Sequence, residues 1–155
     1  MNKILKELND AHYIKYTDLS QLVSLTKPDF VEIKGCILKQ KEERLDSLNM
    51  DNILRVYFDR TSYEASYNEV RINDYIEHKS NMAFEGISIA LELIEIWGKQ
   101  LKTNFPNYKF HIIISNDDVY TTIRFYKLRE SEVSWIILDN LEVYKEEAIL
   151  VNIVQ

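Results

Sequence analysis

The sequence contains very little glycine, proline or cysteine. Its 155 residues include three glycines, two prolines and one cysteine, Cys36. A single cysteine excludes an intrachain disulfide. The glycines, at positions 35, 86 and 98, are too widely spaced for a glycine-rich phosphate-binding loop. The shortage of turn-forming residues predicts long, regular elements with few special turns.

Long apolar runs are missing as well. The longest, such as 112–114 and 135–138, are far too short to span a bilayer, so we expect no membrane partner. The chain starts with charged residues, but no apolar run of signal-peptide length follows them. Together with the lone cysteine, these features predict a cytoplasmic protein.

The chain also lacks an excess of basic residues. Its formal net charge is −6 at pH 7, and both halves carry more acidic than basic side chains. A surface for the phosphate backbone of a nucleic acid is therefore not expected. A basic partner, or one of mixed charge, fits this balance better.

No metal-binding motif is present among the histidines and the cysteine. His12, His78 and His111 have no chelating spacing, and the patterns HExxH and CxxC do not occur. We therefore predict no metal site and no cofactor.

One string resembles a catalytic motif. Residues 28–34 match the PD…(D/E)xK pattern of metal-dependent nucleases, in which two carboxylates bind magnesium. Asp29 lies only three residues before Glu32. The nuclease motif takes its aspartate from a separate, neighbouring strand, so we reject the nuclease interpretation. No catalytic residue is predicted, and the sequence favours a protein that is not an enzyme.

Length and organisation indicate a single domain over residues 1–155. A folded chain of this size buries about two-thirds of its surface, enough for a core without disulfides or metals. No internal repeat, low-complexity stretch or linker divides the sequence.

The clearest predicted element is a helix over residues 81–104. Apolar residues follow helical spacing from Ile87 to Leu101, and Ile89, Leu93 and Ile96 widen this stripe beyond that of a peripheral helix. We expect this helix to be the element around which a sheet folds.

Alternating apolar residues predict strands along much of the remaining chain. The short breaks between the later strands favour antiparallel pairing. Short helices are expected over 2–9 and near 19–25. The predicted fold is α+β, with about five to six antiparallel strands packed on the long helix. The expected strands cover residues 30–39, 53–60, 63–72, 109–115, 119–129 and 133–138, with 149–154 as an edge strand.

Tyrosine and acidic residues supply the candidate binding surface. Several of the ten tyrosines lie on predicted strands near Arg124, a composition typical of protein-binding hot spots. The alternative is a helix-covered sheet whose tyrosines keep a wet hydroxyl. The acidic C-terminal stretch is either a solvated face or a docking patch for a basic partner. The predicted partner-binding residues are Tyr57, Tyr67, Arg124, Tyr126, Glu142, Glu146 and Glu147.

The C-terminal half carries a recognisable pattern. It runs through Phe105-Pro106, Phe110, residues 122–126, Trp135, Leu141-x-x-Tyr144 and residues 149–151. This pattern resembles small single-domain proteins of low-GC bacteria, some of which are immunity proteins of polymorphic-toxin systems. The resemblance implies a small, acidic, cytosolic protein that binds a toxin domain, and it assigns no functional residue.

Three hypotheses follow. The leading one is a non-enzymatic protein-binding module, most concretely an immunity protein that occludes a basic toxin domain. The alternative is a small-molecule-binding or enzymatic α+β domain with a site between the helix and the sheet. The third is a homo-oligomer that associates through its tyrosine face.

Overall fold

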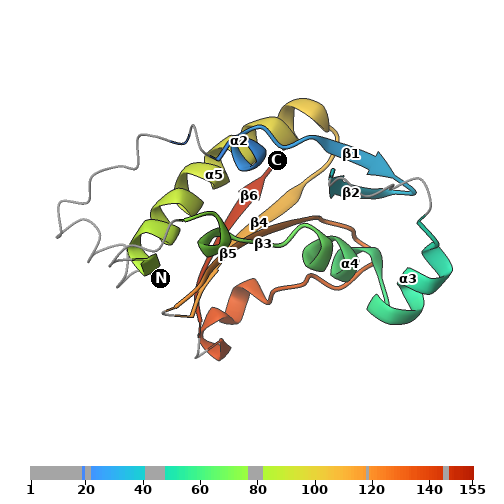
Figure 1. The fold of residues 1–155 in the computed structure, drawn as a ribbon. Coiled ribbons are helices and arrows are strands. Elements are labelled where there is room, and N and C mark those ends of the chain that lie inside the picture. Colours follow the sequence, from blue (N-terminus) through green and yellow to red (C-terminus); the bar gives the residue numbers. More distant parts are fainter. Residues whose placement is uncertain (1–18, 20–21, 41–47, 77–81, 118, 145–146) are drawn as a thin grey trace.

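The computed structural model describes residues 19, 22–40, 48–76, 82–117, 119–144 and 147–155, without the side chains of 82–84, 140 and 142. The helix predicted over 2–9 lies outside these residues. The described chain is α+β, as predicted (Figure 1). Its elements are α2 (Val23–Thr26), β1 (Phe30–Ile33), β2 (Cys36–Lys39), α3 (Met50–Tyr57), α4 (Arg60–Tyr67), β3 (Val70–Arg71), η3 (Ile72–Tyr75), α5 (Met82–Asn104), β4 (Phe110–Asn116), β5 (Thr121–Lys127), η4 (Leu138–Val143) and β6 (Ala148–Val154).

The strands form two antiparallel sheets. β1 and β2 pair as a hairpin, and the larger sheet has the order β3-β5-β4-β6. β6 occupies one end of the larger sheet, which confirms the predicted edge strand. None of the helices in the described part is both long and apolar enough to cross a membrane.

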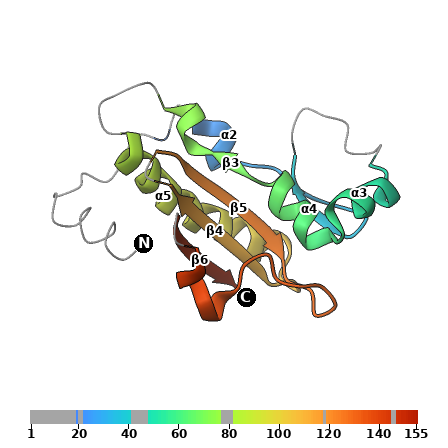
Figure 2. The ribbon, with the colours of Figure 1, turned by 90° about the horizontal axis from the view of Figure 1, so that it is seen from below.

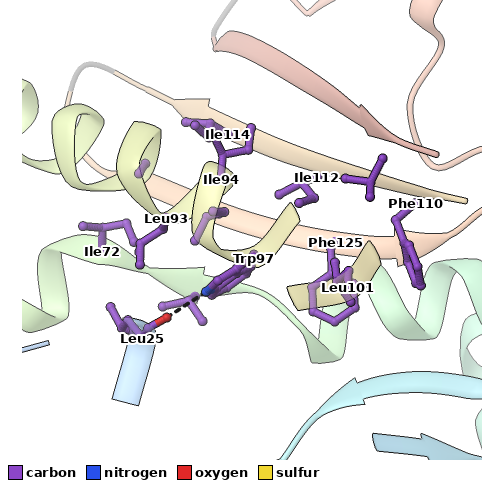
Figure 3. Close-up of a cluster of buried hydrophobic side chains, with 14 of the residues drawn as sticks. Leu25, Ile72, Leu93, Ile94, Trp97, Leu101, Phe110, Ile112, Ile114 and Phe125 are labelled. Carbon is purple, nitrogen blue, oxygen red and sulfur yellow. Dashed lines mark hydrogen bonds between the residues drawn. The ribbon is translucent and has the colours of Figure 1, made fainter. Parts of the chain in front are cut away.

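Helix α5 packs on one face of the larger sheet, as its wide apolar stripe predicted. Figure 3 shows Trp97 at the centre of this core. Its ring meets Phe30 and Phe125 edge-on, with ring centroids 5.9 Å away in both cases. The indole N–H donates a hydrogen bond of 2.8 Å to the backbone oxygen of Leu25, which ties α2 to α5. These contacts fill the space between the helix and the sheet.

The opposite face of the larger sheet is also covered. Ala65 from α4 and Ile136 pack there on Ile113 and Tyr126, and Leu141 lies against the same cluster. The chain between β5 and β6 runs below the sheet in Figure 1, and in Figure 2, which is seen from below, it lies on the viewer's side. This covering chain, residues 128–144, contains the strand predicted over 133–138. That prediction is wrong, because the segment contributes side chains to the sheet face without joining the ladder.

Residues 50–67 differ most from prediction. The strands expected over 53–60 and from Tyr63 to Tyr67 are the helices α3 and α4. Each helix begins at a capping side chain: Asn49 accepts from the Asn52 N–H, and Asp59 accepts from the Ser62 N–H. Phe58 joins the two helices at a φ of 69° with 87% of its surface exposed. Helix capping and packing therefore outweigh the alternation of apolar and polar residues, which had predicted strands here.

Residues 30–39 form a hairpin where one strand was predicted. Lys34 and Gly35 both have positive φ, 51° and 81°, as the two central residues of a type I′ turn require. Ile33 and Cys36 are opposite each other on either side of this turn.

Candidate protein-binding surface

Arg124 points from β5 to the sheet face opposite α5 and lies under the ring of Trp135. Its guanidinium carbon is 5.6 Å from the ring centroid, within the range of a cation–π contact. The same guanidinium lies 2.5 Å from a carboxylate oxygen of Glu69. Arg124 therefore holds Trp135 in position, while 43% of the Trp135 surface remains exposed.

Tyr126 belongs to the same strand face but is completely buried. Its hydroxyl lies 2.7 Å from Ser134 Oγ and 2.8 Å from His111 Nδ1. Burial raises the pKa of Tyr126 and lowers that of His111. Tyr126, which we predicted to bind a partner, has no exposed surface in the single chain, and its hydroxyl links the covering chain to the sheet.

The covering chain presents a row of exposed apolar side chains between Val133 and Val143. Ile136 is buried beneath this row, and the Ile137 N–H donates to the hydroxyl of Tyr144 at 3.3 Å. We call the exposed set the apolar rim; its members are Val133, Trp135, Ile137, Leu138 and Val143, which are 38–80% exposed.

A buried ion pair fixes the start of the covering chain. Glu64 from α4 has no exposed surface, and its two oxygens lie 2.5 and 3.1 Å from the guanidinium nitrogens of Arg129. The backbone N–H groups of Ile37 and Lys127 each donate to the carboxylate at 2.7 Å. Burial raises the pKa of Glu64, and the Arg129 guanidinium and these N–H groups offset part of that effect. The pair thereby joins α4, β2, β5 and the covering chain.

Glu132 adds a second anchor next to this pair. Its carboxylate accepts from both the N–H and the hydroxyl of Thr61, at 2.8 and 2.7 Å. A cavity of about 40 Å³ lies between these groups and Ser134. A space of this size holds one or two water molecules, not a substrate. Sequence reasoning missed Glu64, Arg129 and Glu132, because only folding brings them together.

Tyr57 and Tyr67 lie away from Arg124, in a small cluster of α3 and α4 packed on the hairpin. Both face Tyr63, with ring centroids 5.3 and 5.6 Å away. Both are half-buried. The predicted tyrosine–arginine face is therefore divided between two parts of the molecule.

The acidic stretch is described only in part. Asp139 and Glu147 are exposed. The backbone of Glu142 is described without its side chain, and Glu146 lies outside the described residues. Asp139 lies within η4, close in sequence to the apolar rim, so charge and apolar surface occur together here.

Other candidate groups have structural contacts. Burial, followed by the nearby charge of Glu64, raises the pKa of the Cys36 thiol to about 11. Glu32 contacts Tyr108 and Lys127, whereas the Lys34 ammonium donates to the backbone oxygen of Leu48. Within the described ranges, no three His, Cys, Asp or Glu residues are grouped to hold a metal.

These features define an α+β protein with a long buried helix on one sheet face and an exposed apolar rim on the other. The chain belongs to the uncharacterized protein PM0498 family, whose model matches residues 1–155. The uncharacterized protein PM0498 of Pasteurella multocida (strain Pm70) is 29% identical over 139 residues, covering 84% of this chain and 81% of the relative. No solved structure is significantly similar to the chain.

Proposed function

We propose that this protein is a non-enzymatic protein-binding module whose apolar rim and neighbouring acidic residues contact a basic partner. One observation carries this proposal: exposed large apolar side chains are concentrated in one segment of the covering chain. Five of the twelve exposed large hydrophobic residues in the described part fall between Val133 and Val143. Exposed apolar side chains gathered in this way are typical of protein-interaction surfaces.

The rim is also held in a fixed conformation before any partner arrives. Arg124 supports Trp135 from below, Tyr126 binds Ser134, and buried Ile136 anchors the chain between them. Preorganisation lowers the entropic cost of binding. Tryptophan is also among the residues that contribute most to hot spots.

Charge supports the choice of a basic partner. Asp139 is exposed within η4, between the rim residues Leu138 and Val143, Glu147 is exposed on the segment that follows, and the chain carries a net charge of −6. An acidic surface steers a basic domain towards it and favours fast association. The most concrete form of the proposal is an immunity protein that covers a basic toxin domain, in line with the resemblance of the C-terminal half.

The alternative, a ligand site between helix and sheet, has less support. Trp97, Leu101, Phe110 and Phe125 are fully buried at that interface. Their packing leaves little room for a substrate-sized ligand there, since such pockets usually exceed about 300 Å³.

The test is co-expression with the product of the neighbouring open reading frame. We expect a complex that co-elutes in size-exclusion chromatography, and protection of the host if that product is toxic. Loss of both results contradicts the immunity function.

Variants then test the surface itself. Trp135→Ala with Ile137→Asp should weaken the complex at least about a hundredfold, because it removes an aromatic anchor and places a charge in the contact. The control Val56→Asp introduces the same charge on α3, at a residue that is 62% exposed against 58% for Ile137. Equal binding by the rim variant and the wild type contradicts the proposed surface, whichever partner is used.

A further inference from the structure

Strand β6 has one edge that no described strand covers. All seven of its residues pair with β4, from Ala148 opposite Asn116 to Val154 opposite Phe110. The strand Ala-Ile-Leu-Val-Asn-Ile-Val contains no charge, proline or glycine. The other end of the sheet is β3, with only two residues. Proteins usually shorten or charge such edges to prevent pairing, and β6 has neither protection.

A groove runs beside this edge, between β6 and α5. Its volume is about 230 Å³, and Gly98 forms part of its wall. A Cβ atom at Gly98 would lie 3.5 Å from Val154 Cγ2 and 3.6 Å from Asn152 Nδ2, so the helix approaches the strand closely there. The groove gives side chains of an added strand a place to pack.

The charges along the groove are arranged in two groups. Gly98 of α5 lies beside Asn152 and Val154, so it marks the position of these residues along the strand. Glu95 precedes Gly98 on α5, whereas Lys99 and Lys102 follow it, and all three side chains are exposed. A two-fold axis at this position exchanges the two sides. It therefore brings the acidic side of one copy against the basic side of the other.

We propose that β6 pairs with β6 of a second copy of this chain, antiparallel, about a two-fold axis at Asn152. The two four-stranded sheets become one continuous sheet of eight strands. Glu95 of each copy then faces Lys99 and Lys102 of the second copy. This charge complementarity selects a second copy over an unrelated strand, because one surface supplies both signs.

Pairing in this register also covers an isoleucine side chain that is exposed in the single chain. Antiparallel pairing about Asn152 sets Val151 opposite Ile153 of the second copy, and these two side chains share a sheet face. Ile153 is 47% exposed in the single chain. Pairing covers it with an apolar neighbour. This inference does not depend on the apolar rim, and its variants leave the rim unchanged.

Analytical ultracentrifugation of the full chain over a range of concentrations tests the proposal. The wild type should show a monomer–dimer equilibrium. Glu95→Lys and the double variant Lys99→Glu/Lys102→Glu should each weaken self-association at least about tenfold, because like charges then face each other. The control Lys27→Glu/Arg55→Glu carries the same change in net charge as the double variant, on exposed residues elsewhere, and it should associate like the wild type.

Mixing the two weakened proteins is the decisive measurement. One copy then presents three lysines and the other three glutamates, so an equimolar mixture should form a heterodimer as tight as the wild-type dimer. Circular dichroism of each variant checks that these surface changes leave the fold intact. A monomeric wild type overturns the proposal, and so does a mixture that stays monomeric while the control associates.

Discussion

At the scale of single residues, the buried Glu64 carboxylate connects several elements of the fold. It accepts hydrogen bonds from β2, from β5 and from Arg129, while its own helix α4 packs beneath the sheet. A buried charge is stable only when its lone pairs are satisfied, and here four donors satisfy them. Removing one partner therefore costs more than the removal of a surface ion pair.

Glu64→Gln should lower the free energy of unfolding by about 3 kcal/mol, because it leaves the Arg129 charge buried without a counterion. Adding Arg129→Met should recover part of this loss. The control Glu69→Gln, which breaks the more exposed pair with Arg124, should cost under about 1 kcal/mol. Urea denaturation followed by far-UV circular dichroism measures all four proteins. Equal losses at Glu64 and Glu69 contradict the assigned role.

His111 should make stability depend on pH. Burial lowers its pKa from the ordinary 6.5, so the unfolded chain binds a proton at a higher pH than the folded chain. Its contribution to stability is therefore fully present above pH 6.5 and is lost as the pH falls through that value towards the folded pKa. The slope for one proton reaches at most about 1.4 kcal/mol per pH unit.

The variant His111→Gln isolates this contribution, since all other titrating groups are shared with the wild type. Urea unfolding of both proteins at several pH values around and below 6.5 should show a shallower loss of stability for the variant. Parallel curves for the two proteins contradict a lowered pKa at His111.

At the scale of elements, the two glycines of α5 should respond in opposite ways to alanine. A Cβ at Gly86 would lie 2.8 Å from Thr121 Oγ1, whereas the nearest atom at Gly98 is 3.5 Å away. Gly98→Ala should raise the free energy of unfolding by up to about 1 kcal/mol through helix propensity. Gly86→Ala should lower it by roughly 1–3 kcal/mol, because β5 must shift. Thermal melts compare the two, and stabilisation by both changes contradicts the close contact at Gly86.

Elements with one strong periodicity were predictable from the sequence. Helix α5 and strands β4, β5 and β6 lie where apolar spacing predicted them. Each of their ends is within two residues of the predicted end. Residues 53–60 alternate as well, yet they are helical, because the capping residues Asn49 and Asp59 and packing on the hairpin prevail. The capping residue at the start of each helix was the sequence signal that could have predicted α3 and α4. Periodicity over a few residues does not distinguish a short helix from a strand.

The candidate surface was predictable only in its sheet residues. Arg124 lies in β5, within the strand predicted over 119–129, and on the sheet face opposite α5. The ring that covers it belongs to a segment predicted as a strand. Glu64 and Arg129 are 65 residues apart, so no local pattern connects them. Contacts at such separations depend on the complete fold.

At the scale of the whole molecule, one amide side chain connects the two sheets. Asn68 Nδ2 donates to the backbone oxygens of Ile37 in β2 and Phe125 in β5, at 2.9 and 3.3 Å. Its oxygen accepts from the Lys39 N–H at 2.8 Å. Phe30 from the hairpin also packs edge-on against Phe125, with ring centroids 5.0 Å apart. Polar and apolar contacts therefore both link the hairpin to the larger sheet.

We therefore expect the hairpin and the larger sheet to unfold in one transition. In Trp135→Phe, Trp97 is the remaining tryptophan and reports the main core, while reaction of the buried Cys36 thiol reports the hairpin. Both probes and far-UV circular dichroism should give the same urea midpoint. Asn68→Ala should lower all three midpoints together, by about 1–3 kcal/mol in stability, because it leaves buried backbone groups unsatisfied. If Cys36 reacts at a urea concentration where Trp97 remains buried, the hairpin is a separate unit and this coupling is wrong.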